Sequence, residues 1–206
     1  NETVKSHISG FCEIVRYADD FVCVVQYVEE AKRIEEALKN RFEKYGLELH
    51  PGKTRTFSFG SFERENAQKQ NRRANTFDFL GFTHYCDKTR GGRFKVGRKT
   101  SSKKFKAKCK DMNLWLKSIR NKEKTKDWWK TLRSKLRGHY QYYGVSGNMP
   151  WIIEFHKITI RLTHKWLNRR SQKKRMSWSK MNNYLNCYPL PLPSIKHNIY
   201  TLSHAT

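Results

Sequence analysis

The sequence predicts an α+β protein in which a partial antiparallel sheet with a packed helix precedes an all-α bundle. Short runs of β-branched and aromatic residues fill the first half of the chain, whereas later apolar residues recur every three or four positions. Charge changes at the same boundary. Residues 1–86 carry 13 Lys+Arg and 13 Asp+Glu, while residues 87–175 carry 28 and 5. With 206 residues, the chain is long enough for one large or two small domains.

The first predicted feature is a tight β-hairpin. Residues 11–17 and 21–27 are rich in β-branched and aromatic side chains, so we expect a strand in each. Only Ala18, Asp19 and Asp20 lie between them. This spacing puts two carboxylates at the tip of the hairpin.

A helix and several strands are expected next. An apolar stripe predicts a helix over residues 29–45, with Gly46 as its C-terminal stop. The remaining pattern predicts three strands and one loop. The strands are expected at 53–59, 76–86 and 93–98, and the loop at 61–75.

Helices are expected from about residue 100 onward. Three apolar stripes begin at Phe105, Trp128 and Trp151, and a shorter helix is expected over about 177–187. Three prolines then enforce an extended tail. We therefore expect domains at residues 1–99, 100–188 and 189–206, the last being the tail.

Cysteines and hydropathy restrict the class of protein further. The five cysteines are scattered and no pair has the spacing of metal ligands, so we expect reduced thiols in an intracellular protein. No apolar run approaches the roughly 18 residues of a membrane span. The expected location is the cytoplasm of a bacterium, with an organelle as the alternative.

The excess of positive charge predicts a nucleic-acid partner. The formal net charge is +25, and residues 87–175 alone contribute +23. Such a block, interspersed with aromatics, is typical of a surface that binds a phosphate backbone. The alternative is a basic surface that serves solubility only.

The two hairpin carboxylates suggest metal chemistry. Asp is a common turn residue, so an Asp pair alone is more typical of a solvated turn. Here apolar strands flank the pair and bring two like charges together. Mg²⁺ would relieve the repulsion, and it binds one or two carboxylates together with substrate phosphates. With a basic module downstream, this favours metal-assisted phosphoryl transfer on a nucleic acid.

Tyr17-Ala18-Asp19-Asp20 resembles the active-site motif of reverse transcriptases, and residues 16–22 are typical of group II intron-encoded reverse transcriptases, or maturases. Further segments resemble that family in the expected order, so that the resemblance covers about residues 11–197. These are residues 46–54 (a palm motif with a lysine), 79–82 (the primer grip), 136–144 (a thumb segment) and 166–170 with 189–191 (the ending). The resemblance implies a late palm followed by a thumb.

The resemblance also implies roles for residues in the first part of the chain. Two Mg²⁺ ions, or alternatively Mn²⁺, would activate a primer hydroxyl and stabilise pyrophosphate, with Asp19 as principal and Asp20 as secondary ligand. Lys53 would donate a proton to pyrophosphate or stabilise its charge. Without the resemblance, Lys53 would be interpreted as a solvated loop lysine. Tyr17 and Ala18 would lie near the primer–template. The primer grip would comprise Phe79, Leu80, Gly81 and Phe82, about half of which we expect to be ordinary core.

The basic helical part contains the candidate nucleic-acid contacts. The alternatives are a solvated lysine face and cations that complement the end of a helix. Tyr140 and Tyr143 fit the core stripe, which leaves Tyr142 as the weak candidate for base stacking. The candidates are Lys103, Lys104, Lys106, Lys108, Arg137, His139, Tyr142, Arg169, Arg170, Lys173 and Lys174.

One expected component of the family's active site is missing. The family uses a third carboxylate well upstream of the hairpin, and only Glu2 and Glu13 are available here. We expect a C-terminal part of a longer product that does not polymerise alone and needs an N-terminal fingers and palm segment. Its other partners would be template or intron RNA and a DNA primer. The alternatives are a non-catalytic, RNA-binding maturase fragment and a retron, diversity-generating or CRISPR-associated relative.

Overall fold

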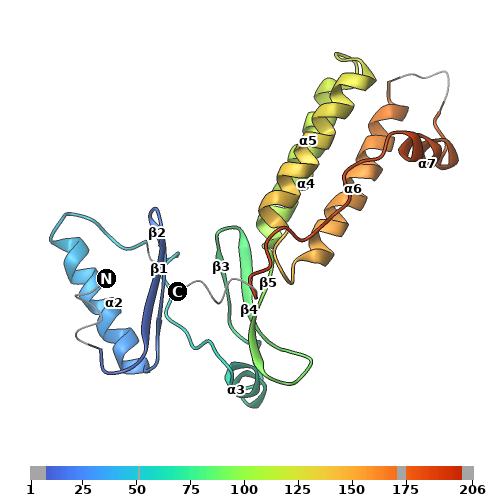
Figure 1. The fold of residues 1–206 in the computed structure, drawn as a ribbon. Helices are drawn as coiled ribbons and strands as arrows, with labels where there is room; N and C mark the ends of the chain where they lie inside the picture. Colours follow the sequence, from blue (N-terminus) through green and yellow to red (C-terminus); the bar gives the residue numbers. More distant parts are fainter. Residues whose placement is uncertain (1–7, 51, 171–174, 201–206) are drawn as a thin grey trace. The chain divides into compact units, whose positions relative to one another are not determined.

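A computed structural model describes residues 8–50, 52–170 and 175–200. The chain forms two compact units, residues 1–76 with 86–95 and residues 77–85 with 96–206. The secondary structure is mixed: strands and helices alternate in the first part of the chain, and helices follow from Ser102 (Figure 1). The predicted α+β class is therefore confirmed.

The first unit opens with the expected hairpin. β1 (Cys12–Tyr17) and β2 (Asp20–Val25) are antiparallel, with Cys12 opposite Val25 and Tyr17 opposite Asp20. α2 (Val28–Glu43) follows and contacts β2. Gly46 ends this region with a φ of +66°, as its role as a helix stop predicts.

A buried carboxylate fastens the chain that enters the hairpin to α2. The Glu30 side chain is buried, and its Oε1 accepts hydrogen bonds from the backbone N and the hydroxyl of Ser9, both at 2.8 Å. The backbone N of Gly10 donates to the same oxygen at 3.3 Å. These bonds fix the chain immediately before β1.

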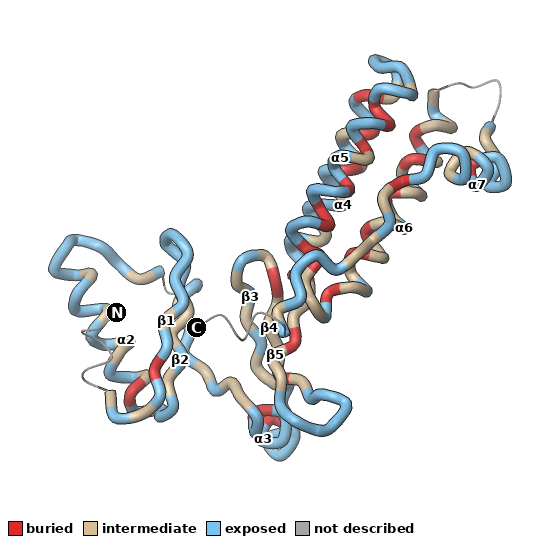
Figure 2. Tube along the Cα trace, viewed as in Figure 1, coloured by how far each residue is buried: buried red, intermediate tan, exposed pale blue. Residues whose placement is uncertain are grey.

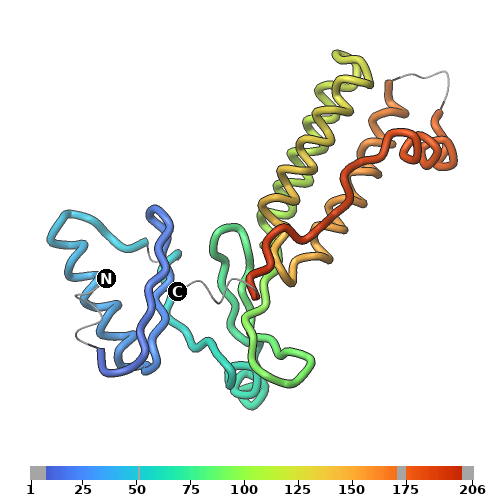
Figure 3. The backbone as a smooth tube through the Cα atoms, in the orientation of Figure 1, coloured from blue at the N-terminus to red at the C-terminus, as the bar shows by residue number. Residues whose placement is uncertain are grey.

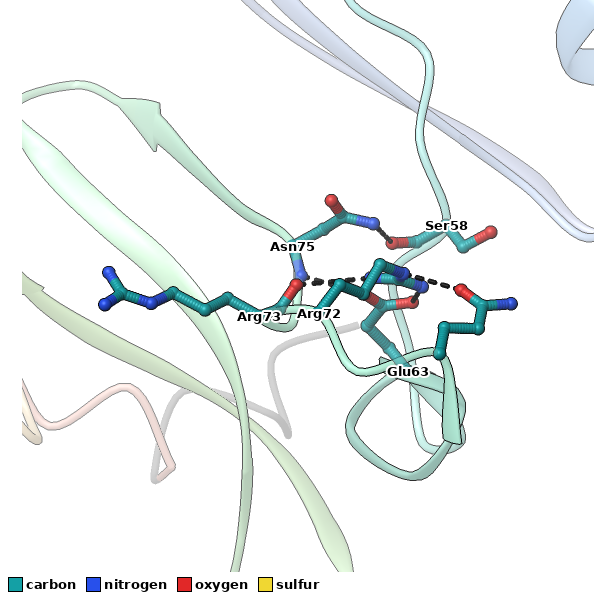
Figure 4. A network of polar contacts seen from close by, with 6 residues as sticks. Ser58, Glu63, Arg72, Arg73 and Asn75 are labelled. Carbon is teal, nitrogen blue, oxygen red and sulfur yellow. Dashed lines mark hydrogen bonds and ion pairs between the residues drawn. The ribbon is translucent and has the colours of Figure 1, made fainter. Parts of the chain in front are cut away.

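The segment between the hairpin region and the next sheet corrects two predictions. No strand forms over 53–59, and the expected loop at 61–75 contains α3 (Glu63–Lys69). A network of polar contacts orders this segment instead, and it includes an ion pair between Glu63 and Arg72 (Figure 4). Glu63 is 3% exposed and accepts from Arg72 Nη1 at 2.6 Å and from the backbone N of Asn75 at 2.8 Å.

Hydrogen bonding by Arg72 holds the pKa of the Glu63 carboxyl below its ordinary value. The Asn75 side chain in turn donates to the carbonyl oxygen of Ser58 at 3.1 Å. This network replaces a strand ladder as the means of ordering the segment.

A three-stranded sheet follows, and the boundary between the two units crosses it. β3 (Thr76–Phe79), β4 (Phe82–Lys88) and β5 (Phe94–Thr100) are neighbours in that order. The single strand predicted at 76–86 is therefore wrong, because Leu80 and Gly81 form a two-residue turn. Both have positive φ, +49° and +78°, as the tight turns that match sheet twist require.

The second unit is built on the predicted helices. They are α4 (Ser102–Ile119), α5 (Thr125–Tyr143), α6 (Met149–Asn168) and α7 (Trp178–Cys187). Buried positions follow the facing stripes of α4, α5 and α6 (Figure 2). Leu116, Leu132, Leu136, Tyr140 and Ile152 are among the fully buried residues. Within the described residues, the helices are too short or too polar to cross a membrane.

The extended segment after α7 packs back against α5 (Figure 3). Trp129 Nε1 donates to the carbonyl oxygen of Tyr188 at 3.2 Å, and Leu190 is buried. Further along, the backbone nitrogens of Lys196 and His197 both donate to the carbonyl oxygen of Gly144. The proline-enforced tail is thus part of the fold of this unit.

Gly144, directly after α5, lies close to that segment, so we expect Gly144→Ala to destabilise the second unit. An added Cβ would overlap the carbonyl oxygen of Tyr140 and lie 2.7 Å from that of Ser194. Because both obstacles are backbone, the expected loss is about 2 kcal/mol in the free energy of unfolding. Denaturant unfolding measures it.

The matched control for this prediction is Gly138→Ala on the same helix. A Cβ at Gly138 meets no atom within 4 Å, so the change should stabilise by about 0.5–1 kcal/mol through helix propensity. Equal effects of the two substitutions would contradict the packing argument.

Candidate active-site hairpin and nucleic-acid interface

The β1–β2 turn presents the two carboxylates to solvent. Ala18 and Asp19 form the turn, and Asp20 is the first residue of β2, opposite Tyr17. Ala18 has a φ of +53°, a strained value for a residue with a Cβ. Tyr17, Ala18, Asp19 and Asp20 are all exposed. The hairpin thus brings together the four residues of the predicted motif.

The donor pair suits a hard divalent cation only in part. Carboxylate oxygens are the ligands Mg²⁺ prefers, and Asp19 and Asp20 would be the ones to hold it. In the part of the chain that the structure describes, no three His, Cys, Asp or Glu side chains gather in a cluster that could bind a metal. Further ligands to such an ion would be phosphate groups, water or residues outside those described.

Lys53 lies in the same unit but is not held near the carboxylates. It is exposed and follows a turn in which its backbone nitrogen donates to the carbonyl oxygen of His50. Within the described ranges, no hydrogen bond or ion pair joins its side chain to Asp19 or Asp20. Its assigned role stays a prediction.

One face of the hairpin is apolar and open. Cys12 and Cys23 project from the face that is covered, and both are buried or half-buried. The other face carries Val15 opposite Val22, and Val24 opposite Glu13. Val15 and Val24 are about half exposed, at 52% and 49%. A two-stranded ribbon with an open apolar face is typical of an incomplete sheet.

The predicted primer-grip residues form the β3–β4 turn of the second unit. Phe79 ends β3, Leu80 and Gly81 make the turn, and Phe82 begins β4. Leu80 is exposed, whereas Phe82 is buried and packs against Tyr143. Phe82 is therefore a core residue and Leu80 and Gly81 are turn residues, and among the four only Leu80 is exposed.

The turn is held by the end of α5. The hydroxyl of Tyr142 donates to the carbonyl oxygen of Leu80 at 2.9 Å, and the Tyr142 ring is stacked with Phe82. The backbone N of Ser101 donates to the carbonyl oxygen of Gly81. Sequence reasoning took Tyr142 as a candidate for base stacking. It is half exposed, as expected, but its hydroxyl already has a partner.

The exposed lysines of α4 lie around its buried stripe as predicted. Lys103, Lys104, Lys106 and Lys108 are exposed, and none is in an ion pair with a described carboxylate. Arg137 on α5 is also exposed. These five cations are available to a polyanion.

His139, predicted as a nucleic-acid contact on the protein surface, lies instead in the core. It is 8% exposed and its ring stacks on Phe155 with centroids 3.8 Å apart. Burial, aided by the positive charge of Lys108, lowers its pKa to about 4. Arg137 and His139 are close in sequence, but the two side chains lie on different faces of α5.

The basic cluster that ends α6 is described in part. Arg169 is exposed and its guanidinium lies over Trp166, while Arg170 is half-buried and donates to the hydroxyl of Thr125 at 2.7 Å. Lys173 and Lys174 lie outside the described residues. Sequence reasoning missed Arg120 and Lys165, whose charged groups also lie over Trp166. The position of Arg120 depends on the packing of α4 against α6, which no local pattern encodes.

The first part of the chain thus presents an exposed pair of carboxylates on a hairpin, and the helical second part presents exposed cations on α4 and α5. Residues 2–84 match the family model described as reverse transcriptase (RNA-dependent DNA polymerase). The match includes the whole β1–β2 hairpin, β3 and the start of β4, but less than half of the chain. No curated protein and no solved structure matches the chain.

Burial of His139 predicts a pH dependence of stability. Its folded pKa lies below the ordinary value of about 6.5, so protonation favours the unfolded chain. The stabilisation is complete above pH 6.5 and falls as the pH drops toward 4, by up to about 3 kcal/mol. Denaturant unfolding of the wild type and of His139→Phe at pH 7.5, 6, 5 and 4 measures this loss of stability. The variant has no imidazole at position 139 to protonate, so its stability should fall less as the pH drops. The same decline in both proteins would contradict it.

Proposed function

We propose that the chain is the late palm and thumb of a group II intron-type reverse transcriptase, or maturase, and that it binds RNA. The observation that supports this most strongly is the family match over residues 2–84, centred on a hairpin that presents Asp19 and Asp20. The order of the later segments that resemble the same family supports the intron type.

In the complete enzyme, Asp19 and Asp20 would hold divalent metal ions, Mg²⁺ or Mn²⁺, which supply activation of the primer hydroxyl and stabilisation of pyrophosphate. Ala18 has a small side chain at the turn and leaves the approach to the carboxylates open. Lys53 would neutralise charge on the departing pyrophosphate. Leu80, at the tip of its own turn, would contact the primer end.

A second candidate function is a non-catalytic, RNA-binding maturase fragment. It is favoured by the solvent exposure of both carboxylates and by the lack of a third metal ligand among the described residues. In this case the basic helices would carry the activity and the hairpin would be a remnant. The two candidates share RNA binding and differ in nucleotide transfer.

RNA binding is expected to depend strongly on salt. If about six phosphates of a single strand are neutralised, the logarithm of the binding constant should fall with the logarithm of salt concentration at a slope near −4. Fluorescence anisotropy of a labelled 16-nucleotide RNA between 0.1 and 0.5 M KCl measures the slope. A slope near zero would exclude binding dominated by phosphate contacts.

Polymerisation should require a further segment. We expect no primer extension from the isolated chain with Mg²⁺, dNTPs and an RNA template, and metal-dependent extension when a fingers and early-palm segment of an intron reverse transcriptase is added. Asp19→Asn should abolish that extension, whereas Glu36→Gln, an exposed carboxylate on α2, should leave it intact.

The outcomes separate the candidates. Extension by the isolated chain would overturn the need for another segment. RNA binding without extension in any mixture would favour the non-catalytic fragment.

A further inference from the structure

Three cationic side chains converge on one tryptophan ring at an end of the helical bundle. Arg120 at the C-terminus of α4 places its guanidinium carbon 4.8 Å from the centre of the Trp166 ring. Lys165, in the last turn of α6, and Arg169, immediately after that helix, lie at 5.2 and 5.3 Å. We call Arg120, Lys165 and Arg169 the cation collar of Trp166.

The ring that supports the collar is fixed in place. Trp166 is 5% exposed, and its Nε1 donates to Asn113 Oδ1 on α4 at 2.9 Å. Because the indole N–H has a partner and the ring is buried, Trp166 cannot rotate away without breaking this bond. The cations that cover its surface are therefore held on a rigid support, unlike a lysine on an open helix face.

A fourth cation beside the collar is also held by hydrogen bonds, but to neutral groups. Arg170 Nη1 donates to the hydroxyl of Thr125 at 2.7 Å, and Nη2 donates to the carbonyl oxygen of Glu123 at 3.4 Å. These contacts orient the guanidinium without neutralising its charge.

No carboxylate balances these charges within the described residues. None of the ion pairs there includes Arg120, Lys165, Arg169 or Arg170. The C-termini of α4 and α6 each contribute roughly half a negative charge. Together these two helix ends offset about one of the four positive charges. Attraction between the cations and the helix ends therefore explains only part of the cluster. The remaining like charges repel one another unless an anion is bound.

We propose that the cation collar of Trp166 is a binding site for a backbone phosphate of a nucleic acid. This inference rests on the proposed RNA-binding function and gives it a specific anchor. Guanidinium groups donate in pairs to phosphate oxygens, and two arginines with one lysine supply enough donors to surround one phosphate. A free phosphate or pyrophosphate ion shares this chemistry, so the experiment must separate the two sources.

The test compares two double variants that remove the same charge. Arg120→Gln with Arg169→Gln removes two collar cations. Lys157→Gln with Arg161→Gln removes two exposed cations from the same helix bundle. Binding of the labelled 16-nucleotide RNA is followed by anisotropy over a series of salt concentrations. Thermal unfolding checks that each protein is folded.

The collar variant should bind at least tenfold more weakly at 0.15 M salt and lose about 1 from the magnitude of the salt slope, since a phosphate contact is removed. The control should change affinity less than threefold. If the wild type binds RNA and the two variants weaken it equally, the collar is not a specific site. If the wild type does not bind RNA, the proposed function fails as well.

A second measurement stays informative if the collar variant does not fold. Arg120→Lys with Arg169→Lys keeps the charge but removes paired donation, and should lose affinity while staying folded. The fluorescence of Trp166 also reports on binding at the collar. Its contribution is the difference between the wild-type and Trp166→Phe spectra, and this difference should change when RNA is added. The same change with millimolar inorganic phosphate, at constant ionic strength, would overturn the assignment to a nucleic-acid backbone.

Discussion

The second unit depends on one buried amide. Asn148 is fully buried and accepts from the backbone N of Thr100 at 2.7 Å through Oδ1. Its Nδ2 donates to the hydroxyl of Thr100 and to the carbonyl oxygen of Tyr143, both at 2.8 Å. The end of β5, the end of α5 and the start of α6 are therefore fixed at one point. Losing the amide would leave several buried polar groups without partners, which costs more than the bonds themselves contribute.

That constraint also bears on the turn that contains the predicted primer-grip residues. Tyr143, bonded to Asn148 through its carbonyl, packs on Phe82, and its neighbour Tyr142 holds the Leu80 turn. The exposed part of the predicted primer grip is thus set by a helix end and not by its own strands. Leu80 keeps its strained positive φ because these contacts together hold the turn in one conformation.

The sequence patterns correctly predicted the elements whose formation depends on neighbouring residues. The β1–β2 hairpin, α2 and the four later helices follow from alternation, apolar stripes and stop residues, and all form close to the expected positions. The errors in the predicted structure arise where contacts with residues elsewhere in the sequence determine the local conformation. Glu63, the first residue of α3, pairs with Arg72 beyond the end of that helix, and the strand expected over 76–86 is divided by a turn that Tyr142 secures. His139 reads as a polar surface residue until Phe155, from another helix, covers it. The motif residues Asp19 and Asp20 were found together because they are adjacent in sequence, whereas the cation collar needs α4 packed on α6.

The two kinds of positive surface in this protein differ in what binding an anion would cost. The α4 lysines are free to move, so ordering each one on a phosphate loses side-chain entropy, and their attraction is screened by salt. Arg120, Lys165 and Arg169 are already confined around a buried ring, and that part of the entropy was lost on folding. The mobile lysines suit attraction of any polyanion and sliding along it. The confined cations suit a phosphate at a fixed position, and a protein that must set the register of an RNA needs both.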